Sequence, residues 1–128
     1  MSTADRPPRL RLFDILDCVH QIQRNTVGMS FDQWRADILR YRAVERWLEI
    51  ISEASRHLTP DMKAREAAID LRQVGNFGNV LRHGYQVVDP RVMWNILTVD
   101  FPPLKEAAAR LYRAEKLPAD PWPDAEST

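Results

Sequence analysis

The chain has 128 residues, 45% hydrophobic and 28% charged, which fits one domain with its own core and excludes a low-complexity protein. Its 18 basic and 18 acidic side chains cancel, so bulk charge does not favour nucleic acid, and a polyanion would need a local basic patch. A single cysteine, Cys18, excludes an internal disulfide, and no apolar run has membrane-spanning length; we therefore expect a cytoplasmic protein without a membrane anchor.

The N-terminal part of the sequence predicts a leader followed by a helix. Residues 1–8 are polar and end in Pro7 and Pro8, and we expect them to form a flexible leader. From Arg9, apolar residues recur at three- and four-residue spacing up to Ile22, which predicts a first helix that ends near Gly28.

A second helix is predicted from a capping signal. Ser30 and Gln33 have the spacing of a capping box, and the apolar stripe that follows continues to Leu58. This pattern predicts one long central helix of roughly 40 Å.

Prolines mark the beginnings of three later helices. Thr59-Pro60 and Asp89-Pro90 each place a capping side chain before a proline, which predicts helices from these points. Another helix is predicted after Pro102-Pro103 and up to about Lys116. With no strand pattern in the sequence, we expect an all-α antiparallel bundle of five or six helices over residues 9–116, followed by a disordered acidic tail at 117–128.

Three carboxylates repeat along the predicted central helix, at Glu45, Glu49 and Glu53. The four-residue spacing puts them in one line, where they could form an acid–base or metal-binding edge. Arginines three residues away favour a salt-bridged, solvent-exposed face instead, which leaves only Glu53 as a candidate. These arginines are Arg42, Arg46 and Arg56.

No metal-ligand spacing is present in the sequence. His20, His57, His83 and Cys18 lie far apart in the chain, so we expect neither a metal ion nor another cofactor. His20 and His57 are interpreted as surface or helix-end histidines.

The stretch 71–89, LRQVGNFGNVLRHGYQVVD, carries the strongest functional signal. Placed on a helix, its apolar residues form one face, and a row of hydrogen-bonding groups forms the other. Gly84 favours a helix end near His83, and a chain reversal there would bring Tyr85 close to the imidazole. The polar row consists of Arg72, Asn76, Asn79 and His83.

Three segments together resemble the HepT-like branch of the HEPN superfamily. They are RAVERWLEIISEA at 42–54, GNVLRHGYQVVDP at 78–90 and WNILTVDFPPL at 94–104, and the resemblance covers about residues 10–112. The family signature is an arginine and a polar residue, a short spacer, then His-x-Tyr at a helix end with an acidic residue after it. Asn79, His83, Tyr85 and Asp89 match this signature, while the family's arginine falls at Gly78.

The resemblance implies metal-independent RNA cleavage. Members of this branch are toxin or effector halves of pairs with a minimal nucleotidyltransferase. In this chain His83 would transfer protons while the ribose 2′-hydroxyl attacks the neighbouring phosphate, and an arginine would stabilise the phosphoryl oxygens. Because Gly78 supplies no cation, Arg82 or Arg72 would approach His83 from the second copy of a two-fold dimer.

Two glycines, Gly75 and Gly78, also favour a homodimer. Each costs about 1 kcal/mol in a helix interior relative to alanine, and a close approach of the partner's helix would explain their presence. Alternatively, they admit a bulky side chain of the same chain, such as Trp47 or Trp94.

Tyr85 has two interpretations. In HepT-like pairs the nucleotidyltransferase transfers AMP groups to this tyrosine, which would add charge beside His83 and exclude RNA phosphate. Alternatively, it is a helix-end tyrosine with its ring on the core. Two alternatives also stay open for the whole chain: an attenuated subunit that binds the nucleotidyltransferase, and a helical interaction module without a nucleic-acid role.

Overall fold

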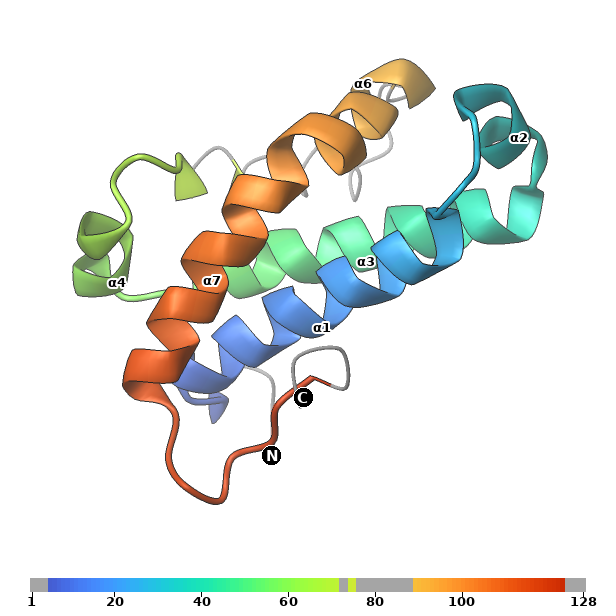
Figure 1. The fold of residues 1–128 in the computed structure, drawn as a ribbon. Coiled ribbons are helices and arrows are strands. Elements are labelled where there is room, and N and C mark those ends of the chain that lie inside the picture. The colour runs from blue at the N-terminus through green and yellow to red at the C-terminus, as the bar shows by residue number, and fades with distance from the viewer. Residues whose placement is uncertain (1–4, 72–73, 76–88, 124–128) are drawn as a thin grey trace.

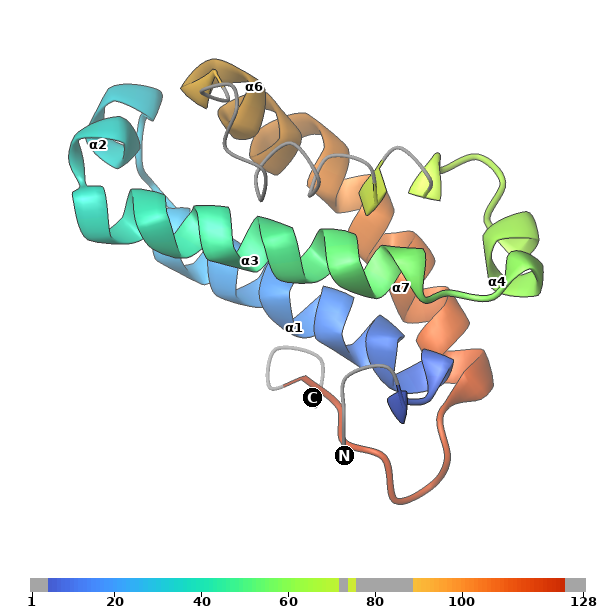
Figure 2. The same ribbon diagram turned by 180° about the vertical axis from the view of Figure 1, so that it is seen from behind.

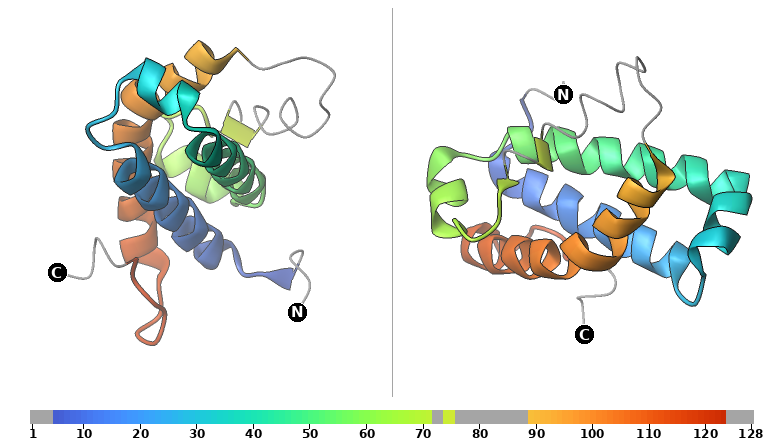
Figure 3. Two further views of the ribbon diagram at one scale, coloured as in Figure 1. Left: turned by 90° about the vertical axis from the view of Figure 1, so that its right-hand side faces the viewer. Right: turned by 90° about the horizontal axis from the view of Figure 1, so that it is seen from above.

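The structure is a computed structural model that describes residues 5–71, 74–75 and 89–123. Within these residues every regular element is helical, which confirms the predicted all-α fold (Figure 1). Helix α1 (Pro8–Thr26) runs antiparallel to α3 (Ile38–Arg56) and lies between α3 and α7 (Phe101–Glu115) (Figure 3). None of the described helices is both long and apolar enough to cross a membrane.

Helix α1 forms the centre of the core, as its periodicity predicts. Its apolar stripe is at most 1% exposed because it faces both α3 and α7. The helix ends at Thr26, and Gly28 turns the chain with a φ of 76°, a conformation that favours glycine. The stripe consists of Leu12, Ile15, Leu16, Val19 and Ile22.

The predicted flexible leader is wrong for its last residues. Pro8 is the first residue of α1, where a proline is tolerated because its missing N–H would have no helical partner. The Arg6 guanidinium binds the Asp14 carboxylate at 2.8 Å, which holds the chain before α1 against that helix.

The predicted single central helix is also wrong, because the chain breaks at Asp37. The capping box is confirmed: Ser30 Oγ accepts from the Gln33 N–H at 3.1 Å, and Gln33 Oε1 accepts from the Ser30 N–H at 2.8 Å. This box begins only the short helix α2 (Phe31–Ala36). Asp37 is extended, with φ −88° and ψ 92°, and its side chain accepts from the Arg40 N–H to cap α3. A local cap therefore overrides a continuous apolar stripe.

Both predicted cap–proline signals are confirmed. Thr59 Oγ1 accepts from the Met62 N–H at 3.1 Å and begins α4 (Pro60–Arg65). Asp89 Oδ1 accepts from the Arg91 N–H at 2.9 Å and begins α6 (Pro90–Asn95).

Pro102 and Pro103 do not begin a separate helix as predicted. Helix α6 passes into the π-helix η2 (Ile96–Asp100), and this continues directly into α7. The Phe101 N–H donates to the Ile96 carbonyl, five residues back. A wider π turn accommodates the two prolines, since they have no N–H and their rings would crowd the carbonyls of an α-helical turn.

Residues 117–123 form a strap over α1 and α7, so the prediction of disorder from residue 117 is wrong for this part. The Trp122 ring stacks on Tyr112 of α7, with centroids 5.1 Å apart and an interplanar angle of 19°. The Tyr112 hydroxyl donates to the Pro121 carbonyl, and Asp120 binds Arg9 of α1 at 2.7 Å. We call residues 117–123 the C-terminal strap.

Candidate functional site

The residues that the sequence predicts for catalysis and modification lie outside the part of the chain that the structure describes. Their roles therefore stay predictions, and so does the helix that would carry them beyond residue 75. The structure does describe both ends of this segment and the surface between them. The residues concerned are Arg72, Asn79, Arg82, His83 and Tyr85, together with Gly78.

The first end of the segment is fixed to α3 at Gly75. The Gly75 carbonyl accepts a hydrogen bond from Ser52 Oγ at 2.5 Å, and a Cβ added at Gly75 would lie only 2.7 Å from Arg56 Cγ. The close approach that favours glycine is therefore made to α3 of the same chain. Neither a partner's helix nor a tryptophan is needed to explain Gly75, and this glycine gives no support to a homodimer.

The other end of the segment lies at Asp89. Its carboxylate caps α6 and also acts on Tyr41 of α3. Burial is the main cause that raises the pKa of Tyr41, and the negative charges of Glu45 and Asp89 add to it. Gly75 is thus held beside the C-terminal half of α3, whereas α6, which begins after Asp89, lies toward the other end of the molecule, next to α2 (Figure 2).

Four aromatic rings pack where α2, α3 and α6 meet, and we call them the aromatic corner. The Trp34 ring stacks on Trp94 with centroids 5.3 Å apart, and it contacts Tyr41 at 4.9 Å and Phe31 at 6.0 Å. Trp34 is 0% exposed, and in the described part of the chain its Nε1–H has no acceptor. The corner fixes the beginning of α6, and hence Asp89, relative to α3.

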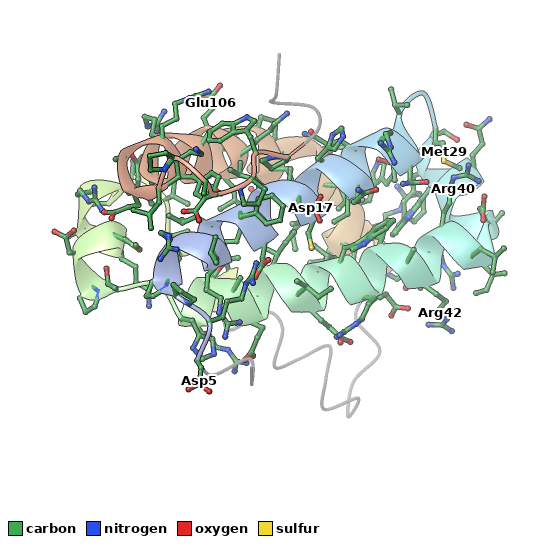
Figure 4. The ribbon with its side chains drawn as sticks, turned by 90° about the horizontal axis from the view of Figure 1, so that it is seen from below. Asp5, Asp17, Met29, Arg40, Arg42 and Glu106 are labelled. Carbon is green, nitrogen blue, oxygen red and sulfur yellow. The ribbon has the colours of Figure 1, made fainter. Side chains whose placement is uncertain are left out.

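Arginines lie on the outer faces of these rings. The Arg35 and Arg42 guanidinium carbons lie 4.8 Å and 5.5 Å from the Tyr41 ring centre, and that of Arg91 lies 4.1 Å from the Phe31 ring centre. Figure 4 shows Arg40 and Arg42 on α3, at the same end of the molecule as Met29. This cluster was not predicted from the sequence. The available signal was an arginine directly after each of two aromatics, Trp34 and Tyr41.

The carboxylate line on α3 is a salt-bridged face, as predicted. Arg42 binds Glu45 at 2.7 Å and Arg46 binds Glu49 at 3.1 Å. Glu53, the remaining acid–base candidate, is bound by Arg56 and also contacts His57 Nε2 at 3.0 Å. Such exposed pairs contribute little to stability, and their carboxylates are engaged by neighbouring cations rather than turned toward a shared cavity.

The remaining candidate groups do not form a site in the described residues. No three His, Cys, Asp or Glu side chains of these residues gather closely enough to hold a metal ion. Cys18 is buried in α1, and burial is the main cause that raises its pKa to about 12, so its thiol stays protonated near neutral pH. His57 ends α3 on the surface and His20 is half-buried on α1.

Comparison with known proteins decides the family. The model of the family described as "Ribonuclease HepT-like" matches residues 15–111. The chain belongs to the HepT-like ribonuclease family. It is 35% identical over 94 residues to "Probable ribonuclease HepT" of Thermococcus cleftensis, which covers 73% of this chain and 86% of that protein. It is also 29% identical over 112 residues to "Putative RNase TTE0752" of Caldanaerobacter subterraneus, which covers 87% of this chain and 99% of that protein.

The HepT-like region extends from the middle of α1 to the last turns of α7. It includes the Gly75 and Asp89 ends of the predicted catalytic segment and the whole aromatic corner. The C-terminal strap lies after the matched residues. No solved structure matches the chain significantly.

Proposed function

We propose that this HepT-like protein is a cytoplasmic, metal-independent endoribonuclease in which His83 transfers protons. Membership of the HepT-like ribonuclease family is the observation that carries this proposal. It is supported by the match of Asn79, His83 and Tyr85 to the family signature. It is also supported by the hydrogen bond that holds Gly75 against α3 and by the cap that Asp89 forms at the start of α6.

The proposed reaction needs few groups. The His83 imidazole accepts the proton of a ribose 2′-hydroxyl, whose oxygen attacks the adjacent phosphorus. The bond from phosphorus to the 5′-oxygen of the next nucleotide breaks, and the protonated imidazole gives its proton to that leaving oxygen. The products are a 2′,3′-cyclic phosphate and a 5′-hydroxyl end. Histidine is suited to this role because its unperturbed pKa lies near neutrality.

The proposed active form is a homodimer. With Gly78 at the position of the family's arginine, one chain lacks the expected cation on that helix. Arg82 or Arg72 of the second copy would then stabilise charge on the phosphoryl oxygens. Asn79 would hydrogen-bond the substrate or orient His83.

We further propose that a minimal nucleotidyltransferase silences the protein by transferring AMP to Tyr85. In this proposal the protein is the toxin of a toxin–antitoxin pair. The phosphate of the attached AMP would repel the RNA phosphates from His83.

Gly78 itself favours a second candidate function, in which the chain is an attenuated subunit that binds the nucleotidyltransferase without cleaving RNA. The two candidates differ in the response to Gly78→Arg. An attenuated nuclease would gain activity when the cation is restored, whereas an active one that takes its cation from Arg82 or Arg72 would not. Sedimentation velocity would show whether the added side chain separates the copies.

Purified protein and labelled RNA in the presence of EDTA test the main proposal. His83→Ala should lower the cleavage rate by at least about a hundredfold, the usual contribution of a general acid–base group. His20→Ala is the matched control, since it removes a histidine from the middle of α1, and it should cleave like the wild type. Equal rates for His83→Ala and the wild type would remove His83 from the mechanism.

The modification proposal has its own readout. Co-expression with a minimal nucleotidyltransferase should restore growth and increase the intact mass by whole AMP groups. Tyr85→Phe should show neither effect. Mass addition that persists in Tyr85→Phe would assign the modification to another residue.

A further inference from the structure

The arginines around the aromatic corner differ in how their charges are balanced. Arg40 binds Asp37 at 2.6 Å and Arg42 binds Glu45 at 2.7 Å. Within the described residues, the side chains of Arg35 and Arg91 make no ion pair, and each guanidinium lies over an aromatic ring. Both side chains are exposed. Two positive charges on this surface thus remain available to an external anion.

The rings hold these two guanidinium groups in place. Arg35 lies over Tyr41, and Arg91 lies over Phe31 at 4.1 Å from the ring centre. A guanidinium on an aromatic face keeps its N–H donors in its own plane, and less side-chain freedom remains to be lost when it binds a ligand. Arginine held in this way can donate two parallel hydrogen bonds to a phosphate.

The two arginines come from different helices, which the aromatic corner packs together. Arg35 belongs to α2 and Arg91 to α6. The rings below them are joined through Trp34, which contacts both Tyr41 and Phe31 and is fully buried. Their relative position therefore depends on core packing rather than on flexible loops.

We propose that Arg35 and Arg91 bind the phosphodiester backbone of single-stranded RNA next to the catalytic segment. This inference rests on the proposed ribonuclease function and names residues that hold its substrate. Arg91 lies directly after the end of that segment, two residues beyond Asp89. Because the whole chain has no net charge, RNA must be attracted by a local cluster, and unpaired arginines supply the required charge.

Binding of a fluorescently labelled single-stranded RNA to the His83→Ala protein tests the proposal without cleavage. Arg35→Gln with Arg91→Gln should weaken binding about tenfold. It should also reduce the slope of log affinity against log salt by about 1.4, because each phosphate contact to a single strand contributes about 0.7. Arg35→Lys with Arg91→Lys keeps both charges and should keep most of this slope.

Arg113→Gln with Lys116→Gln is the matched control. It removes two positive charges from the far end of α7, and Arg113 likewise lies over an aromatic ring, that of Trp122. This control should retain the parent slope and bind within about twofold of the parent. Equal slopes for the corner variant and the control, or no RNA binding by the His83→Ala protein, would overturn the proposal. Thermal melts followed by circular dichroism verify that each variant is folded. If the double corner variant is unfolded, Arg91→Gln alone replaces it and should show half of the expected change in salt slope.

The outcomes separate this inference from the proposed nuclease function. If cleavage depends on His83 but the corner variant has an unchanged salt slope, the nuclease proposal stands and RNA binding by Arg35 and Arg91 is rejected. A reduced slope in a protein that does not cleave RNA would support the RNA-binding surface and reject the nuclease.

Discussion

The two ends of the helical bundle use arginine differently. At the end formed by α4, α7 and the C-terminal strap, two arginines bind carboxylates from other elements, Arg110 to Glu66 at 2.7 Å and Arg65 to Glu115, while Arg113 lies over the Trp122 ring. At the aromatic corner, arginines either pair with a carboxylate three residues away or lie on rings without one. Cross-element pairs join parts of the fold, whereas Arg35 and Arg91 at the corner form no ion pair among the described residues.

The tryptophans at the two ends of the bundle also differ, in how deeply they are buried. Trp34 is fully buried among three other aromatic rings and joins α2, α3 and α6. Trp122 is only half-buried and attaches the strap to Tyr112. If the corner is part of the core and the strap an addition to it, removal of these two side chains should have very different consequences.

Trp34→Ala should have the largest effect. Loss of a fully buried tryptophan leaves a cavity, and we expect the free energy of unfolding to fall by about 3–5 kcal/mol. Trp34→Phe should cost much less, since it keeps a ring in the cluster and removes an Nε1–H that has no acceptor among the described residues. Urea denaturation of both variants measures the difference. A Trp34→Ala protein as stable as the wild type would show that the corner is not core.

Trp122→Ala should have a smaller effect. The stack on Tyr112 and the buried apolar area together are worth about 1–2 kcal/mol, and the strap lies after the residues that match the HepT-like family. We therefore expect a modest loss of stability in urea with unchanged RNA cleavage. A loss of cleavage at full folding would instead connect the strap to the active site.

Local signals made the helices predictable. The caps at Ser30, Thr59 and Asp89 each depend on residues within three positions of each other, and the structure contains all three. The apolar stripe of α1 is likewise a local pattern. Such features could be predicted because the sequence alone places their partners.

Features that depend on distant partners could not be predicted in this way. The apolar stripe continues through Asp37, so the sequence pattern did not indicate that the helix breaks there. The prolines after Leu117 suggested disorder, although Trp122 stacks on a ring of α7. The arginines at the aromatic corner lie on rings that three helices bring together, so no short stretch of the sequence predicts their arrangement. For the predicted catalytic segment the family signature supplied the candidates His83 and Tyr85, and the structure adds the attachment of Gly75 to α3.

The ion pair of the strap gives the smallest predicted effect and a defined dependence on pH. Hydrogen bonds from the Arg9 guanidinium and the Leu117 N–H hold the pKa of Asp120 below its usual range. A carboxyl with a lowered folded-state pKa stabilises the fold above its unfolded pKa of about 3.9, and this contribution is lost as the pH falls through the folded value. Asp120→Asn should therefore melt slightly below the wild type at neutral pH, and the gap should close below about pH 4. Asp17→Asn, which removes a carboxylate that forms no ion pair in the described chain, is the control and should show no such convergence. A gap for Asp120→Asn that persists in strong acid would mean that the strap is held by the Trp122 stack and not by this charge.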